Sequence, residues 1–458
     1  MSLVATILTI ALIAWLFHLS REENAETSKA LWIPVLWLLI VASRPVSLWL
    51  HVTREVTLED RYTEGSPLDA TYFAILVVAA ALTLNRRWVR VKSFLQANLP
   101  VLLFFLYCGL SIVWADSPVI SLKRWIKAVG DVAMILVVLT DPNPALAIRR
   151  IFERVGFVLL PLSILFILFF PSMGSSYDAI DHVTMYFGVT TFKNLLGVTC
   201  MFCGLGALWS FIGAYQDRNS PNRMRLLMTS GLMILMAEWL VWKADSMTSM
   251  SSLGLAGMVM VMASTRWVTR RPATVLLFVA VAAGVALFAL FMDTSGSMVQ
   301  SIGRNASLTG RTQIWAAVLA QPINPVLGTG FESFWVGNRL QAVWNLSQVG
   351  IEEAHNGYLE LYLNLGWVGL TLLGLLIVSG YHNAVTMLKR DPSAARLRIS
   401  FLTCGVIYSC TEAGFRMMSP VWIGVLLGVT ALPIYQEQER QQLHDFSLRS
   451  RRPARILQ

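Results

Sequence analysis

Long apolar runs separated by short polar segments recur along the whole chain. Each holds about 17 to 25 residues, the length that a helix needs to cross a hydrocarbon core roughly 30 Å thick. Lipid offers no hydrogen-bond partner to unpaired backbone groups, so runs of this length are expected to be helices. A membrane β-barrel would need alternating segments of about 10 residues, which the chain lacks. The pattern predicts an all-α polytopic integral membrane protein with about 12–13 transmembrane helices.

The predicted spans are residues 1–19, 30–50, 68–84, 98–114, 120–140, 151–171, 194–215, 226–242, 250–264, 272–292, 357–381, 397–411 and 417–434. The first has no basic start and no small-residue cleavage site, so it is predicted to be a retained span rather than a signal peptide. The run at 120–140 is the one that the pattern supports least, because it carries Lys123, Arg124, Lys127 and Asp131.

Composition agrees with a membrane protein. Hydrophobic residues make up 55% of the chain, charged residues only 14%, and the mean hydropathy is +0.60. A soluble domain carries roughly 25% charged residues. The five cysteines lie in or near apolar runs and are expected to be buried thiols. The pair in CMFC (200–203) has the spacing of a zinc or redox site, but it stands alone inside a predicted span, which argues against both.

Lys and Arg gather in alternate loops, at residues 85–92, 149–150, 217–225, 265–272, 388–398 and 450–455. Basic loops of membrane proteins face the cytoplasm, so these loops are predicted to be cytoplasmic. The external side then receives residues 51–67, 172–193, 243–249 and 293–356. In a Gram-negative cell this side is the periplasm.

This topology divides the chain into N-terminal helices (1–171), central helices (172–292), a large external loop (293–356), C-terminal helices (357–434) and a basic tail (435–458). The external loop has about 60 residues and no long apolar run, and such loops are usually functional rather than simple connectors. The basic tail is predicted to be cytoplasmic and to contact anionic lipid.

The external loop ends in a polar cluster of Glu353, His355 and Asn356, directly before the next apolar run. A histidine titrates near neutral pH, so it can take a proton from a hydroxyl group. Taken alone, His355 is explained more simply as an interfacial histidine that hydrogen-bonds a loop carbonyl. Both interpretations stay open on this residue.

The external side also collects cations at or near the ends of spans: Lys123, Arg124, Lys127, Lys193, Arg304, Arg311 and Arg416. Ionisable groups near membrane depth are costly, so they normally pair or bind a ligand. Glu353, Glu360 and Glu412 are the candidate partners, and for any single cation an ion pair is at least as good an explanation as a ligand. Together the cations indicate an anionic substrate, and Arg suits phosphate because its guanidinium makes two parallel hydrogen bonds.

Other chemistry finds little support. Asp178, Asp181 and His182 lie close together, but a metal site would need a further ligand that is not evident nearby, so a solvated loop is the better interpretation. The chain has no P-loop and no HExxH motif, which leaves an ATP-driven pump and a zinc protease without support.

Five motifs follow one another in the second half of the chain: GVTTFKNLLG (188–197), DSMTSMSSLG (245–254), TGRTQIW (309–315), PVLGTGFESFW (325–335) and AHNGYLELYLNLGWVGL (354–370). In this order, over roughly residues 185–435, the chain resembles the O-antigen ligase and polysaccharide polymerase family of bacterial membrane glycosyltransferases. The pairing of TGRTQIW with FKNLLG and ESFW is closest to the exopolysaccharide polymerase branch. Residues N-terminal to the motifs resemble the family only in hydropathy.

The resemblance implies a GT-C-like glycosyltransferase of the bacterial inner membrane whose active site faces the periplasm. Its donor would be a glycan on undecaprenyl pyrophosphate. A polymerase transfers the glycan, with inversion, to a sugar hydroxyl of another lipid-linked unit, and an O-antigen ligase transfers it to lipid A core. No metal or nucleotide cofactor is implied, because the donor arrives activated, and no nucleic acid is involved. Membrane lipids, a flippase and chain-length or export proteins are the further partners.

The same resemblance makes His355 the candidate base and Arg311 the first candidate for binding the diphosphate. The further candidates for substrate binding are Arg124, Lys193, Lys243, Arg416, Asn356, Glu360 and Trp335. Met247 stands where the family often has a basic residue, and Lys243, about one turn away, is the candidate replacement. Gly328 and Gly330 are expected to shape a turn.

Two questions stay open at this stage. Trp315, Phe334, Trp335 and Trp344 either stack on sugars or anchor the loop, and both roles suit aromatic residues. The competing class of function is a transporter or flippase for an anion or a lipid-linked sugar. Transporters tend to carry charges near the midplane and to show two related halves. Here the charges gather at the external ends of spans, which favours an enzyme.

Overall fold

The computed structural model describes residues 1–21, 27–52, 65–178, 183–265, 307–347 and 351–431, and five single positions between 268 and 284. The predicted span 272–292 lies largely outside the described residues, and the tail 435–458, Asp181, His182 and Arg304 lie wholly outside them. The described chain is helical apart from one two-stranded antiparallel sheet, so the predicted all-α class is confirmed.

The elements in chain order are α1 (Ser2–Leu19), η1 (Lys29–Leu31), α2 (Trp32–Val41), α3 (Val46–Trp49), α5 (Pro67–Arg86), α6 (Trp88–Ala97), α7 (Leu99–Leu110), η2 (Ser111–Trp114), α8 (Pro118–Leu139), α9 (Pro144–Phe169), α10 (Pro171–Gly174), β1 (Ser175–Asp178), β2 (Val183–Tyr186), α11 (Lys193–Gln216), α12 (Arg223–Ala244), α13 (Met247–Ala263), α17 (Ser307–Leu319), α18 (Gly337–Ser347), α19 (Gly357–Met387), α20 (Pro392–Tyr408) and α21 (Pro420–Val429). Each predicted span within the described residues coincides with one or more of these helices.

Within the described residues, six helices are long and apolar enough to cross a membrane, or seven if the bent pair α6 and α7 counts as one span. Three shorter apolar helices accompany them. The number is below the predicted one for local reasons. The run at 30–50 is broken into α2 and α3, α6 and η2-extended α7 meet at 91°, and α8 keeps its four charged residues. The chain is a multi-pass membrane protein with several short or broken apolar helices.

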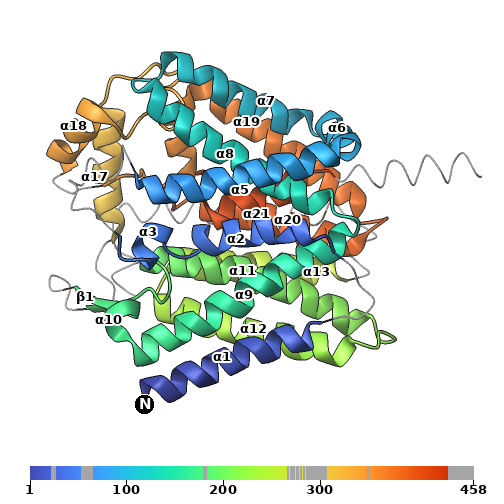
Figure 1. Cartoon of the computed structure of the whole chain (residues 1–458). Coiled ribbons are helices and arrows are strands. Elements are labelled where there is room, and N and C mark those ends of the chain that lie inside the picture. The colour runs from blue at the N-terminus through green and yellow to red at the C-terminus, as the bar shows by residue number, and fades with distance from the viewer. Residues whose placement is uncertain are drawn as a thin grey trace, which may run out of the picture.

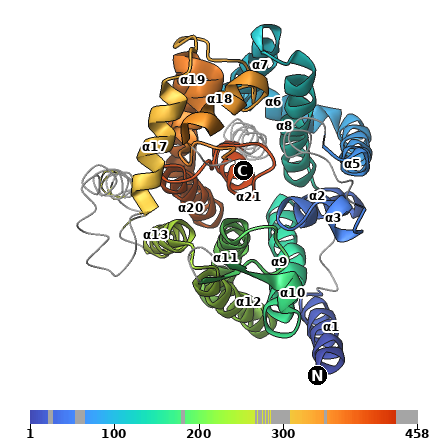
Figure 2. The ribbon, with the colours of Figure 1, turned by 90° about the vertical axis from the view of Figure 1, so that its left-hand side faces the viewer.

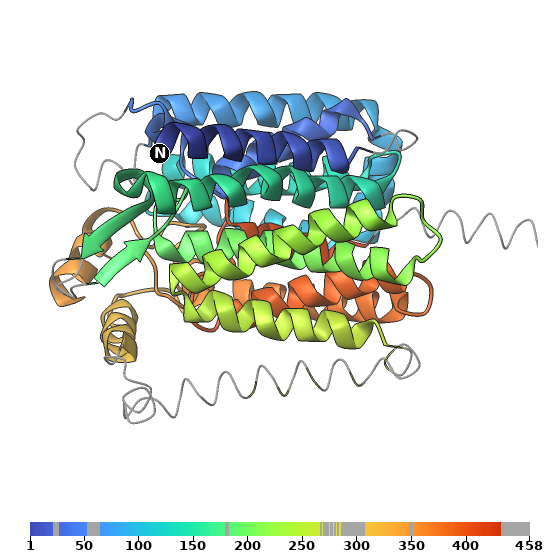
Figure 3. The same ribbon diagram turned by 90° about the horizontal axis from the view of Figure 1, so that it is seen from below.

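Most of the helices run alongside one another, with short connections at the two ends of the bundle (Figure 1). Helices α17 and α18 and the β1–β2 hairpin lie at one end, and α6 lies at the other (Figures 1 and 3). The view along the bundle places α11 and α21 inside and α1 and α5 at the outside (Figure 2). Accordingly every residue of α21 is buried, whereas α1 leaves an almost wholly apolar surface exposed, as a helix that faces lipid should.

Helix α19 is interrupted at Gly366, and the loop between α17 and α18 packs against this break. Gly366 has φ +61° and ψ −162°, a backbone conformation that only glycine adopts readily. The break frees backbone groups, and residues 325–330 pair with them. The amide of Trp367 donates to the carbonyl of Pro325 at 2.9 Å, and the amide of Gly330 donates to that of Asn364 at 2.9 Å.

Gly328 and Gly330 form the turn that brings residues 325–330 against this break. Their φ angles are +71° and +96°, and a Cβ atom on Gly328 would lie 2.4 Å from the backbone of Asn364. The turn expected from the sequence is therefore confirmed, and its reason is close approach of two backbones as well as dihedral freedom.

We expect Gly366→Ala to destabilise the protein by about 1–3 kcal/mol, because alanine is strained in this conformation. Its Cβ atom would also lie 2.3 Å from the carbonyl oxygen of Val326. Thermal unfolding in detergent measures the effect. Gly374→Ala is the matched control, because a Cβ atom at this position of α19 meets no atom within 4 Å. Equal unfolding midpoints for the two variants would contradict the account of the break.

Candidate active site

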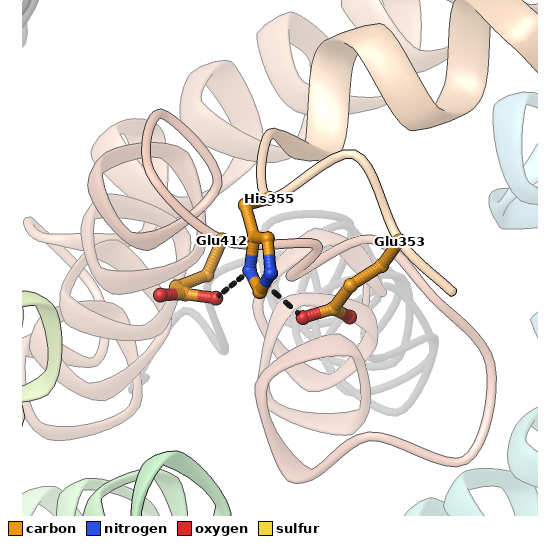
Figure 4. A group of neighbouring side chains, drawn as sticks. All are labelled: Glu353, His355 and Glu412. Atoms are coloured by element: carbon orange, nitrogen blue, oxygen red, sulfur yellow. Dashed lines mark hydrogen bonds and ion pairs between the residues drawn. The ribbon is translucent and has the colours of Figure 1, made fainter. Parts of the chain in front are cut away.

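His355 lies between two carboxylates in the loop that precedes α19 (Figure 4). Its Nδ1 atom is 3.0 Å from Oε2 of Glu412 and 3.1 Å from Oε1 of Glu353. Within the described residues no hydrogen bond reaches Nε2, so the second ring nitrogen remains available on the side away from this contact. The imidazole is therefore oriented by the contacts of Nδ1, and Nε2 can form a hydrogen bond to another group.

Glu412 joins three further segments to this histidine. It lies in the turn between α20 and α21 and is only 5% exposed. Its Oε1 atom accepts hydrogen bonds from Nη2 of Arg311 on α17, at 3.0 Å, and from Nδ2 of Asn194 on α11, at 3.4 Å. A buried carboxylate needs such partners, because an uncompensated charge away from water is costly. Glu412 is thus the centre of a cluster that also contains His355, Arg311, Asn194 and Glu353.

The two carboxylates keep His355 protonated at neutral pH. Partial burial of the ring disfavours the charged form, but the hydrogen bonds and charges of Glu353 and Glu412 outweigh this and raise the pKa of His355 to about 10. Burial by itself would raise the pKa of Glu353, but contact with His355 and the nearby arginines lowers it below its ordinary value. The resting cluster is therefore an imidazolium between carboxylates.

A second ion-pair group adjoins the first. Nε of Arg416 is 3.2 Å from Oε2 of Glu332, and its Nη1 is 3.8 Å from Oε2 of Glu353, which links the two groups. Arg124, on α8, donates to the backbone carbonyl of Glu332. Burial opposes the charge of Arg416, but the surrounding carboxylates raise its pKa above the ordinary value. Three of the predicted cations, Arg311, Arg416 and Arg124, are thereby brought into one neighbourhood.

Glu360 and three tryptophans hold the segment that carries His355. Oε1 of Glu360 accepts from Nε1 of Trp335 at 2.6 Å, and Oε2 accepts from the amide of Ala354 at 2.9 Å. Trp315 donates its Nε1–H to the carbonyl of Ala354 at 2.8 Å, and Trp344 donates to Ile351 at 2.7 Å. Trp335 is only 3% exposed. Of the two roles left open for these side chains, the contacts are those of loop anchors.

Asn356 fixes the start of α19. Its Oδ1 atom accepts from the amides of Tyr358 and Leu359, both at 3.0 Å, and its Nδ2 donates to the carbonyl of Cys410 at 3.1 Å. Both polar atoms of this side chain are engaged in a helix cap and a loop contact. Asn356 thus joins the His355 segment to the turn that carries Glu412.

The motifs at 188–197 and 245–254 contact each other next to the turn that carries Glu412. A Cβ atom on Gly197 would lie 2.5 Å from Oγ of Ser249, so only glycine permits this approach of α11 to α13. The hydroxyl groups of Thr248 and Thr411 are 2.9 Å apart, which ties α13 to the turn of Glu412. The motifs at 188–197 and 245–254 are therefore parts of one packing arrangement next to the cluster.

The two predicted lysines lie differently. Lys193 is the first residue of α11, next to Asn194, and no ion pair of its side chain occurs within the described chain. Lys243 lies at the end of α12 with Nζ 4.9 Å from the ring of Trp242 and 5.1 Å from that of Tyr186. Among the described contacts none joins Lys243 to Glu412, so the structure brings neither lysine side chain into the ion-pair groups.

The donor atoms of Glu353, His355 and Glu412 lie within 4.8 Å of one another, a spacing that can hold a metal ion. The charges favour another description. Arg311 neutralises Glu412 and Arg416 faces Glu353, so each carboxylate already has a cationic partner. The group fits an ion-pair network better than a metal site.

Backbone strain gathers in the same place. Five non-glycine residues of the described chain have positive φ, and four of them, Asp245, Glu332, His355 and Met418, lie in the segments around these ion pairs. Residues held in such conformations cost about 1–3 kcal/mol each and cluster at functional sites. The strain marks this neighbourhood as the candidate active site.

Comparisons with known proteins agree with the motifs. Residues 231–374 match the O-antigen ligase domain family. This stretch includes Arg311, Glu332 and His355. The match supports the predicted resemblance to the O-antigen ligase and polysaccharide polymerase family. It is similar to the exopolysaccharide production protein ExoQ of Rhizobium meliloti (strain 1021), with 26% identity over 335 residues that cover 71% of this chain and 74% of the relative.

The roles of the acidic residues and of Asn194 were not evident from the sequence. Glu412 and Glu353 were expected only as counter-ions, and Glu332 and Asn194 were parts of quoted motifs without a role. The available signal was that Glu353 and Glu412 lie in polar segments directly beside apolar runs. What the sequence does not contain is the distance between these segments, which lie up to 218 positions apart.

We expect the His355 ion pairs to stabilise the protein in acid and neutral solution and to lose this effect in alkali. The folded pKa of about 10 exceeds the ordinary value of 6.5, so the contribution is complete below about pH 6.5 and is lost as the pH rises through about 10. His355→Gln should therefore lower the thermal unfolding midpoint more at pH 6 than at pH 10. His382→Gln, near the other end of α19, is the control for loss of a histidine. A His355→Gln deficit independent of pH would contradict the assigned charge state.

Proposed function

We propose that this protein is a bacterial polysaccharide polymerase. It transfers a glycan from undecaprenyl pyrophosphate to a sugar hydroxyl of another lipid-linked unit, at the periplasmic face of the inner membrane. The observation that carries the proposal is the cluster of His355, Arg311 and Arg416 around the carboxylates of Glu353 and Glu412. Similarity to an exopolysaccharide production protein favours polymerisation. The match to the O-antigen ligase domain makes transfer to lipid A core the second candidate.

The arginines suit the leaving group. Arg311 and Arg416 are held by carboxylates, yet 21% and 28% of their side-chain surfaces stay exposed. Guanidinium groups fixed before the substrate arrives stabilise the charge that develops on the diphosphate as the C1–O bond breaks. Arg124 and Lys193 lie in adjoining segments and extend the positive region. Because arginines supply this charge, the proposed reaction needs no metal ion.

His355 suits the acceptor side. Contact of Nδ1 with Glu412 fixes the ring, so that Nε2 of the neutral imidazole can take the proton of the attacking hydroxyl. The hydroxyl oxygen forms a bond to the anomeric carbon on the face opposite the diphosphate. The diphosphate leaves with the electron pair of the broken bond, and the configuration at the carbon inverts. The imidazolium of the resting cluster must release its proton before each such step.

Purified protein in nanodiscs, given a lipid-linked repeat unit without nucleotide or metal, tests this proposal. We expect longer glycans on the lipid carrier, and a loss of at least about a hundredfold in His355→Ala and in Arg311→Ala, because each removes a group that acts on the reacting atoms. His382→Ala and Arg218→Ala are matched controls at positions outside the cluster, and both should keep full activity.

The remaining outcomes separate the alternatives. Transfer that occurs only after lipid A core is added would replace polymerase by ligase. Full activity in the folded His355→Ala and Arg311→Ala variants would contradict the site. Inertness of the wild type with both acceptors and the cognate donor would contradict the enzyme and favour a transporter.

The rate should also rise with pH. If neutral His355 is the base, its fraction grows roughly tenfold for each pH unit below its pKa of about 10, so activity should increase from pH 7 to pH 9. Glu353→Gln removes one carboxylate partner, lowers the pKa of His355 and should move this rise to lower pH. A profile that is flat from pH 6 to pH 9 in both proteins would exclude neutral His355 as the base and transfer proton acceptance to a carboxylate of the cluster.

A further inference from the structure

Arg44 lies in the connection between α2 and α3, far in sequence from the motifs, and binds the chain that leads into α11. Its Nε donates to the carbonyl of Thr190 at 3.0 Å, and its Nη2 donates to the carbonyl of Gly188 at 2.8 Å and to that of Met173. One planar side chain thereby holds both sides of the β1–β2 hairpin, because residue 173 precedes the hairpin and residues 188–190 follow it.

The surroundings of Arg44 are aromatic. The rings of Trp49, Phe166 and Phe187 have their centroids 5.6, 5.8 and 5.7 Å from the guanidinium carbon. Among its described partners are backbone carbonyls and ring faces but no carboxylate. The planar guanidinium therefore acts here as a donor of several hydrogen bonds that also packs against aromatic rings.

The segment that Arg44 binds has little freedom of its own. Gly188 has φ +54°, and its amide donates to the carbonyl of Gly174 at 2.9 Å. The hydroxyl of Thr190 donates to the carbonyls of Phe187 and Phe192, at 2.7 and 3.0 Å. Since Phe192 is the residue that caps α11, the position of Arg44 is transmitted directly to the start of that helix.

The start of α11 carries Asn194, whose side chain reaches Glu412 in the active-site cluster. A second contact links the same helix to the end of α2: the hydroxyl of Thr199 donates to the carbonyl of Ala42 at 2.8 Å. Arg44 and Ala42 therefore hold the first two turns of α11 from one short stretch of the chain. A shift of this helix start would change the contact between Asn194 and Glu412, and with it the support of His355.

We propose that Arg44 is a positioning residue for the transfer reaction, acting through residues 187–192 and Asn194 on Glu412 and His355. This inference rests on the proposed function, because Glu412 and His355 are its endpoints. A lysine keeps the charge but offers a single ammonium group, which cannot span carbonyls that a planar guanidinium bridges. Geometry, and not charge, is the property that Arg44 supplies.

The test compares Arg44→Lys and Arg44→Gln with wild type in the glycan-transfer assay. We expect kcat to fall about tenfold in both variants, with KM for the lipid-linked donor changed less than about twofold, because misplacement affects the reaction step more than donor binding. A double-mutant cycle with Asn194→Ala should show coupling, so that Arg44→Lys lowers kcat only slightly in a protein that already carries Asn194→Ala. Arg90→Lys is the matched control, since Arg90 donates to the carbonyl of Thr140 at 2.8 Å at the opposite end.

Hydrogen–deuterium exchange supplies a readout that does not depend on the reaction. Arg44→Lys should speed exchange in peptides covering residues 187–196, whereas Arg90→Lys should not. Full activity of Arg44→Lys, or costs that add without coupling to Asn194→Ala, would overturn the proposal. An inactive wild type that still shows the exchange difference would count against the proposed function and leave the structural link of Arg44 to α11 intact.

Discussion

Glu412 is a carboxylate buried at the end of an apolar helix bundle, and its charge constrains everything around it. An ion in such surroundings costs several kcal/mol unless cations and hydrogen-bond donors compensate it. The compensation comes from α11, α17 and the loop before α19, through Asn194, Arg311 and His355. These segments cannot separate without exposing an unpaired charge. One buried acid thereby joins these three segments and its own α20–α21 turn into a single site.

The backbone solves a related problem at the break in α19. A helix interrupted within an apolar bundle leaves amides and carbonyls that need partners. Residues 325–330 supply them, and the same loop continues into Glu332 and Trp335, which contact Arg416 and Glu360. The break thus does more than bend a helix. It docks the loop whose side chains complete the ion pairs and hold the segment of His355.

These two constraints explain what the sequence could and could not predict. Hydropathy is a local property, so the long apolar helices were predicted. Helices α6, α10, α17 and α18 lie mainly in segments that were predicted to be loops, so hydropathy did not reveal them. His355 and Arg311 were predicted because they belong to motifs in a recognisable order. The roles of Trp335 and Asn356 depend on partners that arrive from other segments, and their contacts turned out to be those of anchors and caps. The position of Lys243 likewise depends on its neighbours, because its ammonium group packs against the rings of Tyr186 and Trp242.

The charge state of His355 follows from the way it is held. The carboxylates that orient the imidazole also stabilise its proton, and with a pKa raised to about 10 the neutral form is a small minority at pH 7. A ring held by neutral carbonyls would be more often available as a base, but it would not be tied to Arg311 and Arg416 through shared anions. This arrangement fixes the position of the imidazole at the expense of the fraction of molecules in which it is neutral. It also makes the support of Glu412 decisive, because any residue that positions this carboxylate, however distant in the chain, sets both the orientation and the proton affinity of the histidine.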